Sequence, residues 1–383
     1  MKLLQVINSL DPRTGGPAEH MRVLEPVLRG MGHETDIACF DGSAAEWLNG
    51  WSCKVHTFGP AVTKFGFSRG FLPWLKKEKS NYDAVIVRGL WQYSGYAVWL
   101  ALKHSKTPYF VFPHGMLDPW FNKMYPLKRL KKLVYWHLGG RDVLRDARAV
   151  LFTSEQERRL ARNSFSGYKC RERVVSYGTV ASPDGAERLK QVFLERFPML
   201  KGKKVFLFLG RIHEKKGCDI LISAFAEPMS AGKDAVLVMA GPGEKVLVDR
   251  LKDKAGRSGV ADRILWTGML YGEDKWGAFY SADLFVLPSH QENFGIAVAE
   301  ALSSGTPVLI TDKVNIWETI DSSHAGIVVG DDACGVKSGM LRWAEMGAGQ
   351  REDMRVMAKE CFDKNFHIQA AAESLISAVR DNL

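Results

Sequence analysis

The chain has 383 residues, 46% of them apolar and 25% charged, a composition typical of a globular protein and a length that fits two domains. It contains no apolar run near the ~20 residues of a membrane-spanning helix and no secretory-signal pattern, so we expect a cytoplasmic protein. Its six cysteines are scattered and form no Cys-x-x-Cys pair, so we expect neither disulfides nor zinc. The net charge of +9 is uneven, because residues 1–180 hold 27 Lys and Arg against 15 Asp and Glu; this indicates either an anionic partner for that half or a solvated basic surface.

Short runs of β-branched and other apolar residues recur along the chain, and amphipathic stretches separate them. Several runs show no polar alternation, which is typical of parallel strands covered on both faces. Strands that alternate with helices predict doubly wound α/β sheets. The predicted strands are Leu3–Ile7, Thr35–Phe40, Lys54–Phe58, Ala84–Val87, Tyr109–Phe112, Ala149–Thr153, Arg173–Tyr177, Lys204–Leu209, Ala235–Ala240, Ile264–Trp266, Leu284–Leu287, Pro307–Thr311 and Ile327–Val329.

The strand series restarts at Lys204 after a predicted helix. We therefore predict two Rossmann-like domains, residues 1–180 and 181–365, with the boundary just after Tyr177-Gly178-Thr179. A last helix, at about 366–383, has no strand after it. Because ligands of open α/β sheets bind at the carboxyl ends of the strands, we expect the chemistry in a cleft bounded by those ends of both sheets.

Two candidate ligand contacts follow strands of the first domain. Gly15 and Gly16 come after the first strand, where small residues let the backbone approach a ligand, and Pro17 suits a first helical turn. The loop is not Gly-x-Gly-x-x-Gly, so a tight turn is the simpler interpretation. His114 follows a buried strand within Pro113-His114-Gly115-Met116-Leu117-Asp118-Pro119-Trp120. Its ring could donate to a ligand oxygen there, although a lone histidine is usually structural.

Two cations follow the first strand of the second domain. Arg211 and Lys216 lie five residues apart within the segment 210–217, and such a pair can neutralise a diphosphate, Arg as a planar fork and Lys as a point charge. Surface clusters of this kind are also common. The chain has no Asp-x-Asp pair, which an enzyme that holds a nucleotide diphosphate through a divalent metal usually needs. We therefore expect no metal, with the two cations in its place. After the next strand, a loop expected near a nucleobase contains Gly241, Pro242 and Gly243.

The strongest motif is the segment 290–301, where a polar loop follows a buried strand and a helix is predicted to begin near Gly295. Free N–H groups and the helix dipole attract anions at such a helix start. Glu300 lies roughly 7 Å beyond it at ~1.5 Å per residue, and Glu292 precedes it. The order carboxylate, amide groups, carboxylate matches sugar hydroxyls, a diphosphate and a ribose diol; the alternative is an ordinary helix start between solvated glutamates. The candidate donor contacts are Glu292, Asn293, Phe294, Gly295 and Glu300.

Together these segments resemble the family 4 glycosyltransferases of GT-B fold over essentially the whole chain. The resemblance is specific in the second half, where a Gly-Arg…Lys-Gly signature precedes Glu-(seven residues)-Glu. It implies metal-independent, retaining transfer of a hexose from a nucleotide diphosphate sugar, with the choice between UDP and GDP left open, and no other cofactor. It also implies that Arg211 and Lys216 hold the diphosphate, Glu300 the ribose and Glu292 the donor sugar.

In the first half, Pro-His-Gly-Met-Leu-Asp-Pro-Trp resembles a subgroup from bacterial polysaccharide clusters. The implied acceptor is a saccharide or a lipid-linked saccharide of the cell surface. We expect no nucleic acid among the binding partners. The resemblance implies that Gly16 lies near the phosphates and His114 near the outer hydroxyls of the sugar. Trp91 and Asp118 are candidates for contact with the acceptor or with a membrane. It also implies that the last helix crosses back to the first domain. Arg88 departs from the pattern, which is expected to have His, so the acceptor pocket stays open.

The segment 127–136 is both basic and amphipathic. It could lie on an anionic membrane surface, where lipid-linked acceptors are found, and this would make the protein peripheral on the inner face of the cytoplasmic membrane. The alternative is a helix packed on its own domain with solvated cations. The side chains concerned are Lys128, Arg129, Lys131 and Lys132.

No carboxylate is placed as a nucleophile by the sequence, so we expect a front-face reaction in which the leaving diphosphate helps to deprotonate the acceptor. Two other classes compete with this interpretation. One is an epimerase-like or phosphorylase-like enzyme of the same architecture, and the other is a catalytically silent nucleotide-binding subunit. A catalytically silent subunit would not need the full set of predicted donor contacts, and this chain keeps Arg211, Lys216, Glu292 and Glu300.

Overall fold

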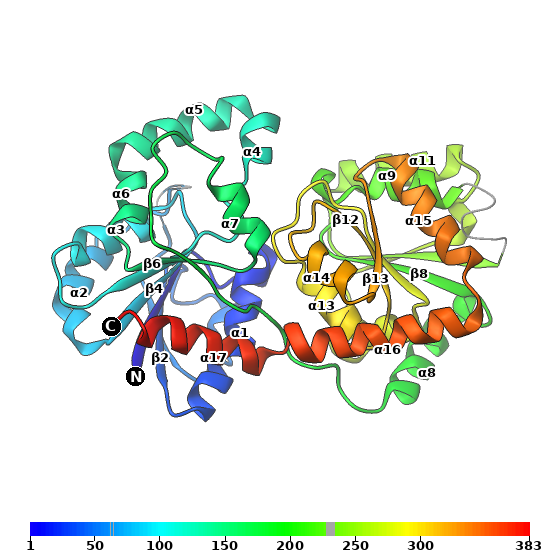
Figure 1. The fold of residues 1–383 in the computed structure, drawn as a ribbon, viewed down its shortest axis with the longest axis horizontal. Coiled ribbons are helices and arrows are strands. Elements are labelled where there is room, and N and C mark those ends of the chain that lie inside the picture. The colour runs from blue at the N-terminus through cyan, green and yellow to red at the C-terminus, as the bar shows by residue number, and fades with distance from the viewer. Residues whose placement is uncertain (62, 64, 227–233) are drawn as a thin grey trace. The chain divides into compact units, whose positions relative to one another are not determined.

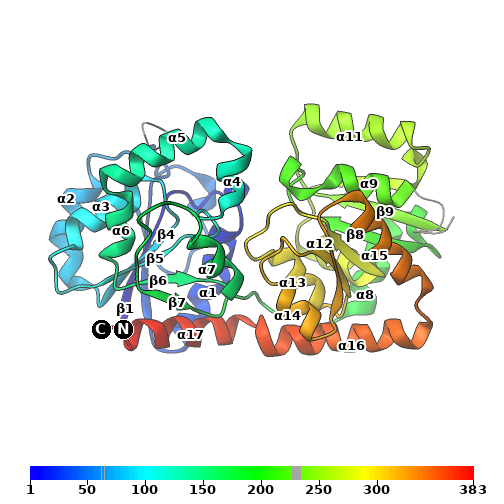
Figure 2. The same ribbon diagram turned by 45° about the horizontal axis from the view of Figure 1, so that its top comes forward.

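The computed structural model describes residues 1–61, 63, 65–226 and 234–383 (Figure 1). The chain divides into two compact units. Unit 1 consists of Met1–Thr179 and Ile368–Leu383, and unit 2 consists of Val180–His367. Each unit has a parallel sheet with helices on both faces, as the two views in Figure 1 and Figure 2 show.

Within the described residues, unit 1 contains a seven-stranded parallel sheet of order β3-β2-β1-β4-β5-β6-β7. The order turns between β1 and β4, and this switch point is where open α/β sheets bind ligands. The strands are β1 (Lys2–Ile7), β2 (Glu34–Cys39), β3 (Lys54–Thr57), β4 (Ala84–Arg88), β5 (Tyr109–Phe112), β6 (Ala149–Phe152) and β7 (Glu172–Val174). The helices are α1 (Gly16–Gly30), α2 (Phe71–Glu78), α3 (Tyr93–Leu102), α4 (Pro119–Met124), α5 (Pro126–Tyr135), α6 (Arg141–Arg145), α7 (Glu155–Ala161) and α17 (Ile368–Arg380).

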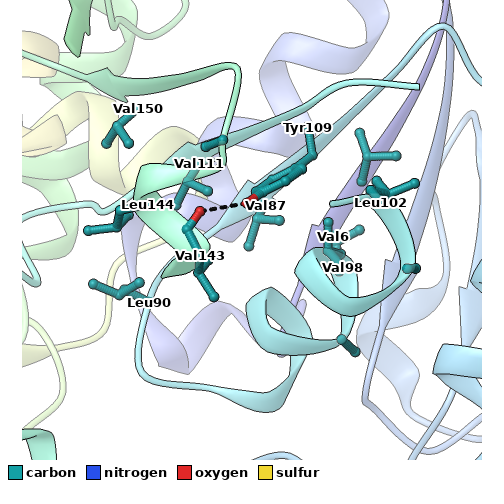
Figure 3. Close-up of a cluster of buried hydrophobic side chains, with 14 of the residues drawn as sticks. Val6, Val87, Leu90, Val98, Leu102, Tyr109, Val111, Val143, Leu144 and Val150 are labelled. Atoms are coloured by element: carbon teal, nitrogen blue, oxygen red, sulfur yellow. Dashed lines mark hydrogen bonds between the residues drawn. The ribbon is translucent and has the colours of Figure 1, made fainter. Parts of the chain in front are cut away.

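The two faces of this sheet have separate apolar cores, because successive side chains of a strand point to opposite sides. Val6, Val87 and Val111 pack against α3 and α6, and the hydroxyl of Tyr109 donates to the carbonyl oxygen of Val143 at 2.8 Å (Figure 3). The opposite face is covered by α1 and α17, which lie side by side in both ribbon views. The last helix thus belongs to the core of unit 1.

The described part of unit 2 contains a six-stranded parallel sheet of order β10-β9-β8-β11-β12-β13, which turns between β8 and β11. The strands are β8 (Lys204–Leu209), β9 (Ala235–Ala240), β10 (Ile264–Gly268), β11 (Leu284–Leu287), β12 (Val308–Thr311) and β13 (Gly326–Val329). The helices are α8 (Ala186–Arg196), α9 (Cys218–Ala226), α11 (Lys245–Arg257), α12 (Gly272–Ser281), α13 (Ile296–Ser303), α14 (Trp317–Ser322), α15 (Ala333–Glu345) and α16 (Ala348–Asn365).

The predicted doubly wound α/β fold is confirmed, and each predicted strand is present in the expected order. The predicted strand Arg173–Tyr177 is corrected, because β7 ends at Val174 and Tyr177 instead stacks on His20 of α1, with ring centroids 3.6 Å apart. The last helix begins at Ile368, shortly after α16 ends. Among the described residues, no helix is long and apolar enough to cross a membrane.

Candidate active site

The switch point of unit 2 brings together the two loops in which the sequence predicts donor contacts. The loop after β8 carries Arg211 and Lys216, and the loop after β11 carries Glu292. Gly217 makes this approach possible, because it has φ +64° and a Cβ there would lie 2.1 Å from the carbonyl oxygen of Pro288. Only glycine fits such a position. The backbone therefore fixes the cation-bearing segment against the end of β11.

The loop after β9 lies against the same segment. Gly241 has φ +136°, and a Cβ there would lie 2.0 Å from the carbonyl oxygen of Gly210. The carbonyl oxygen of Pro242 accepts a hydrogen bond from the N–H of Ile212 at 2.7 Å, and Gly243 forms a β-bridge with the same residue. The predicted 241–243 contacts thus lie beside the segment that carries Arg211.

Lys216 and Glu292 form an ion pair in which the side chains are only 13% and 14% exposed. Burial raises the pKa of Glu292, but the charges of Lys216 and Lys215 outweigh it and hold that pKa below its ordinary value. Glu292 is therefore a carboxylate at neutral pH. Two residues that the sequence analysis assigns to different parts of a donor are already bound to each other.

Arg211 differs from Lys216 in its surroundings. Its side chain is exposed, and it makes no hydrogen bond or ion pair with any residue in the described ranges. An exposed guanidinium with unused donors at a sheet's carboxyl edge is available to an incoming anion.

Helix α13 begins after Gly295, in agreement with the predicted helix start, and Gly295 has φ +78°. Glu300 lies inside the helix with its side chain 8% exposed, and Nζ of Lys275 donates to its Oε1 at 2.8 Å. Lys275 belongs to α12, and Nζ also lies 4.8 Å from the centroid of the Trp276 ring. Sequence reasoning missed Lys275, because no motif links it to a carboxylate 25 residues later.

Asn293 and Phe294, which follow Glu292 directly, have partners within unit 2. Phe294 is buried, and its ring meets the edge of Phe366 at 5.6 Å. Oδ1 of Asn293 accepts a hydrogen bond from Nδ2 of Asn315 at 3.4 Å. Phe294 therefore packs the base of the loop, which gives it a structural role in addition to any donor contact.

In unit 1, Gly15 precedes α1 with φ +123°, and Gly16 and Pro17 form the first turn of that helix. A Cβ at Gly15 would have no neighbour within 4 Å, so the backbone conformation, and not crowding, favours glycine there.

His114 follows β5 with φ +49°. Its ring stacks on Phe112 at 5.3 Å between centroids, and its buried Nε2 has no hydrogen-bond partner among the described residues. Burial, followed by the charge of Arg88, holds the pKa of His114 well below its ordinary value. The next residue anchors the turn, since the N–H of Gly115 donates to Oε1 of Glu157 at 2.6 Å.

Trp91 and Asp118, predicted on the acceptor side, help to build the loops around them. The indole N–H of Trp91 donates to the carbonyl oxygen of Met116 at 3.0 Å, and its ring contacts Tyr135 at 5.7 Å between centroids. Asp118 caps α4 by accepting a hydrogen bond from the N–H of Trp120 at 2.8 Å. A contact of either residue with an acceptor stays a prediction.

The predicted amphipathic helix is α5, and its cations do not form one set. Lys128, Arg129 and Lys131 are exposed. Lys132 instead turns toward aromatic rings, with Nζ 5.0 Å from the centroid of Trp91, and burial lowers its pKa. The four-residue basic face predicted from the sequence is thus reduced to three solvent-facing cations. No group of three or more His, Cys, Asp or Glu residues that could hold a metal occurs within the described ranges.

The comparisons with known proteins agree with this architecture. The family "Glycosyl transferase 4-like domain" matches residues 15–178, and the family "Glycosyl transferases group 1" matches residues 192–360. The predicted GT-B fold is confirmed, because the chain has two parallel α/β sheets and solved structures of GT-B glycosyltransferases match it over its whole length, with a TM-score of 0.77 for Anabaena Alr3699/HepE. The chain therefore contains a glycosyl transferase 4-like domain followed by a glycosyl transferases group 1 domain.

Individual relatives cover different parts of the chain. Mannosylfructose-phosphate synthase of Agrobacterium fabrum is 34% identical over 141 residues, which are 35% of this chain and 31% of that protein, so the match spans about a third of the relative. Alpha-monoglucosyldiacylglycerol synthase of Streptococcus pneumoniae is 25% identical over 310 residues, 78% of this chain and 68% of that protein. Anabaena Alr3699/HepE, solved in complex with UDP-glucose, shares the fold with a TM-score of 0.80 at 17% identity over 100% of both chains.

Proposed function

We propose that this glycosyltransferase transfers a hexose, with retention and without a metal, from a nucleotide diphosphate sugar to a saccharide or lipid-linked saccharide of a bacterial cell surface. The observation that carries the proposal is the Lys216–Glu292 pair beside the unpaired Arg211 at the switch point of unit 2. The UDP-glucose bound to the Anabaena neighbour supports a nucleotide sugar as donor.

The ion pair gives a physical account of how the donor is received. A diphosphate at this edge attracts Arg211 and competes with Glu292 for Lys216. Glu292, once released, has both carboxylate oxygens available for the hydroxyls of the donor sugar. Glu300 is held by Lys275 and can accept hydrogen bonds from a ribose diol. The phosphate and sugar contacts are therefore coupled through Lys216.

The two cations can also lower the barrier of the chemical step. As the glycosidic bond breaks, about one further negative charge develops on the departing phosphate, and fixed positive charges stabilise that state more than the bound donor. A phosphate oxygen of the departing group can take the proton of the acceptor hydroxyl on the face where the new bond forms, and the configuration is then retained. The bond to the leaving diphosphate breaks as the bond to the acceptor oxygen forms.

The test is a transfer assay with UDP- and GDP-hexoses, a saccharide acceptor and excess EDTA. We expect release of the nucleoside diphosphate that depends on acceptor, activity that survives EDTA, and a product whose anomeric proton coupling matches that of the donor. An isomerised nucleotide sugar without released nucleotide would identify an epimerase. Activity lost to EDTA and restored by Mg²⁺ or Mn²⁺ would refute metal independence.

We also propose that unit 1 docks peripherally to the inner face of the cytoplasmic membrane through α5 and the turn that follows it. Leu127, Leu130, Val134 and Leu138 stand at helical spacing and are 82%, 63%, 54% and 72% exposed. Exposed cations lie between them, which is the arrangement of a helix that lies in a membrane interface. The glycolipid named by the Streptococcus relative supports an acceptor held at such a surface.

A further inference from the structure

A buried polar cluster lies at the switch point of unit 1, whereas the donor site described above is built from residues of unit 2. It consists of Arg88, the last residue of β4, His20 of α1 and His114, just after β5. Arg88 and His20 are each 3% exposed. The three side chains come from elements that meet where the strand order turns, which is the place where open α/β sheets bind ligands.

Arg88 is held in place through one edge only. Its Nε donates to Oε1 of Gln5 at 2.8 Å, and its guanidinium lies 4.3 Å from the centroid of the Phe112 ring. Nη1 and Nη2 are buried, and neither has a hydrogen-bond partner among the described residues. A buried charge whose donors are unused costs free energy of folding, so the chain maintains an unfavourable arrangement here.

The two histidines add unused ring nitrogens beside this guanidinium. His20 stacks on Tyr177, and neither of its ring nitrogens has a partner within the described part of the chain. Nε2 of His114 likewise has no hydrogen-bond partner among the described residues. Burial, with the nearby charge of Arg88, holds the pKa of both histidines well below the ordinary value. Both rings are therefore neutral, and Arg88 supplies the only fixed positive charge of the three.

We propose that Arg88, His20 and His114 bind the carboxylate of an acidic sugar, a uronic acid, as part of the donor or the acceptor. The inference rests on the proposed glycosyl transfer and adds the class of sugar. Nη1 and Nη2 form the planar edge that matches two carboxylate oxygens. One fixed charge balances a carboxylate, whereas a phosphate dianion would remain half neutralised. The neutral rings can each donate one hydrogen bond to the same group or to a neighbouring hydroxyl.

A ligand-binding role of Arg88 and a structural role predict different effects of its replacement on the stability of the chain. If Arg88 serves the fold, its removal lowers stability. If Arg88 instead binds an anionic ligand, its replacement by an apolar side chain of similar length removes an unpaired buried charge from the free chain. Arg88→Met should therefore keep or raise the melting temperature of the free chain. Because both Nη atoms are shielded from solvent, binding must also open the cluster locally, and we expect slow association.

The experiment measures binding to the full chain by titration calorimetry. One arm compares UDP-glucuronate with UDP-glucose and GDP-mannuronate with GDP-mannose, and it tests an acidic donor. A second arm compares methyl glucuronide with methyl glucoside and glucose 6-phosphate in the presence of the nucleotide, and it tests an acidic acceptor. UDP and GDP alone report on the nucleotide site of unit 2. The variants are Arg88→Met, Arg88→Lys and, as a control with the same charge change, the exposed Arg69→Met.

We expect one arm to show at least about tenfold tighter binding of the uronate than of its neutral partner. The preference should vanish in Arg88→Met, weaken in Arg88→Lys, which keeps the charge but loses the fork, and persist in Arg69→Met. Equal binding of both partners in both arms overturns the inference, as does tighter binding of glucose 6-phosphate. If Arg88→Met does not fold, the Lys variant decides, because an unchanged preference there also overturns it. Failure of both nucleotides to bind would instead refute the proposed function.

Discussion

At the scale of single residues, Arg211 offers the sharpest test of the donor site. Its exposed guanidinium has no partner in the described ranges, so Arg211→Ala should leave the melting temperature nearly unchanged. The loss of this cationic donor to the departing phosphate should slow single-turnover transfer by about 10²–10³. Arg257→Ala, at an exposed position in α11, is the matched control and should keep the normal rate. A normal rate in Arg211→Ala would remove Arg211 from the mechanism.

Lys216→Ala should differ from Arg211→Ala in stability, which the sequence alone does not predict. Removing Lys216 leaves the carboxylate of Glu292 without its ion-pair partner in a site only 14% exposed, and an unpaired buried charge is destabilising. We expect a lower melting temperature as well as a slower rate, with the double variant Lys216→Ala, Glu292→Gln partly restoring stability. Equal melting temperatures for Lys216→Ala and Arg211→Ala would show that the pair does not contribute to folding.

The buried histidines predict how stability depends on pH. The pKa values of His20 and His114 lie well below the ordinary 6.5, so below about pH 6.5 the unfolded chain binds a proton at each ring and the folded chain does not. The free energy of unfolding should therefore fall as the pH falls, by ~1.4 kcal/mol per pH unit for each histidine. Denaturant titrations between pH 7 and pH 5 measure this. His20→Phe should reduce the slope, whereas the exposed His104→Gln should not.

The residues of the donor site were predictable one by one, but their pairing was not. Lys216 and Glu292 each belong to a motif that can be read locally, yet their contact joins residues 76 positions apart. The same holds for Lys275 and Glu300, and for Arg88 with Gln5, 83 positions away. Local sequence indicates which side chains follow a strand, whereas the packing of distant elements decides which of them meet.

At the scale of elements, α5 should decide membrane binding. Replacing Lys128, Arg129 and Lys131 together by Gln should weaken binding to phosphatidylglycerol vesicles by about 10² in low salt, since each charge contributes ~1 kcal/mol. Lys132 is left out because it packs on Trp91. A second variant, Leu127→Ser with Leu130→Ser, should weaken binding at any salt concentration. Neutralising Lys252, Lys254 and Arg257 of α11 is the control, and equal losses there would mean non-specific attraction.

The strands were predictable because those of a doubly wound sheet are buried on both faces and read as continuous apolar runs. β8 and β9 illustrate this, since both have the predicted bounds. The error at β7 has a physical cause: the run Arg173–Tyr177 is apolar enough for a strand, but its last residue is needed for a ring contact with α1. Tertiary packing, which propensity does not contain, ends the strand early.

At the scale of the whole molecule, unit 1 depends on its distant last helix. Leu375, Ile376 and Val379 of α17 are buried in the core beneath the sheet. Ending the chain after His367 should therefore expose this face, and unit 1 should become sensitive to protease while unit 2 stays resistant. Ending it after Arg380 removes the exposed Arg173–Asp381 ion pair and a few hydrogen bonds to the last turn of α17, which contribute little, and should leave both units intact. Equal resistance of unit 1 in both truncated chains would refute this dependence.

The position of α17 also reverses the order in which the two units can mature on the ribosome. The N–H of Ile368 donates to the carbonyl oxygen of Thr179 at 2.9 Å, so unit 2 is an insertion whose two ends meet at one point of unit 1. Domains generally fold as units, the first synthesised before the next. Here the strands of unit 1 are synthesised first, but their core is incomplete until α17 has been synthesised. Unit 2 therefore completes its core before unit 1 does. We expect the nascent chain to hold an open sheet until translation has passed residue 380, which makes it a client for chaperones during that interval.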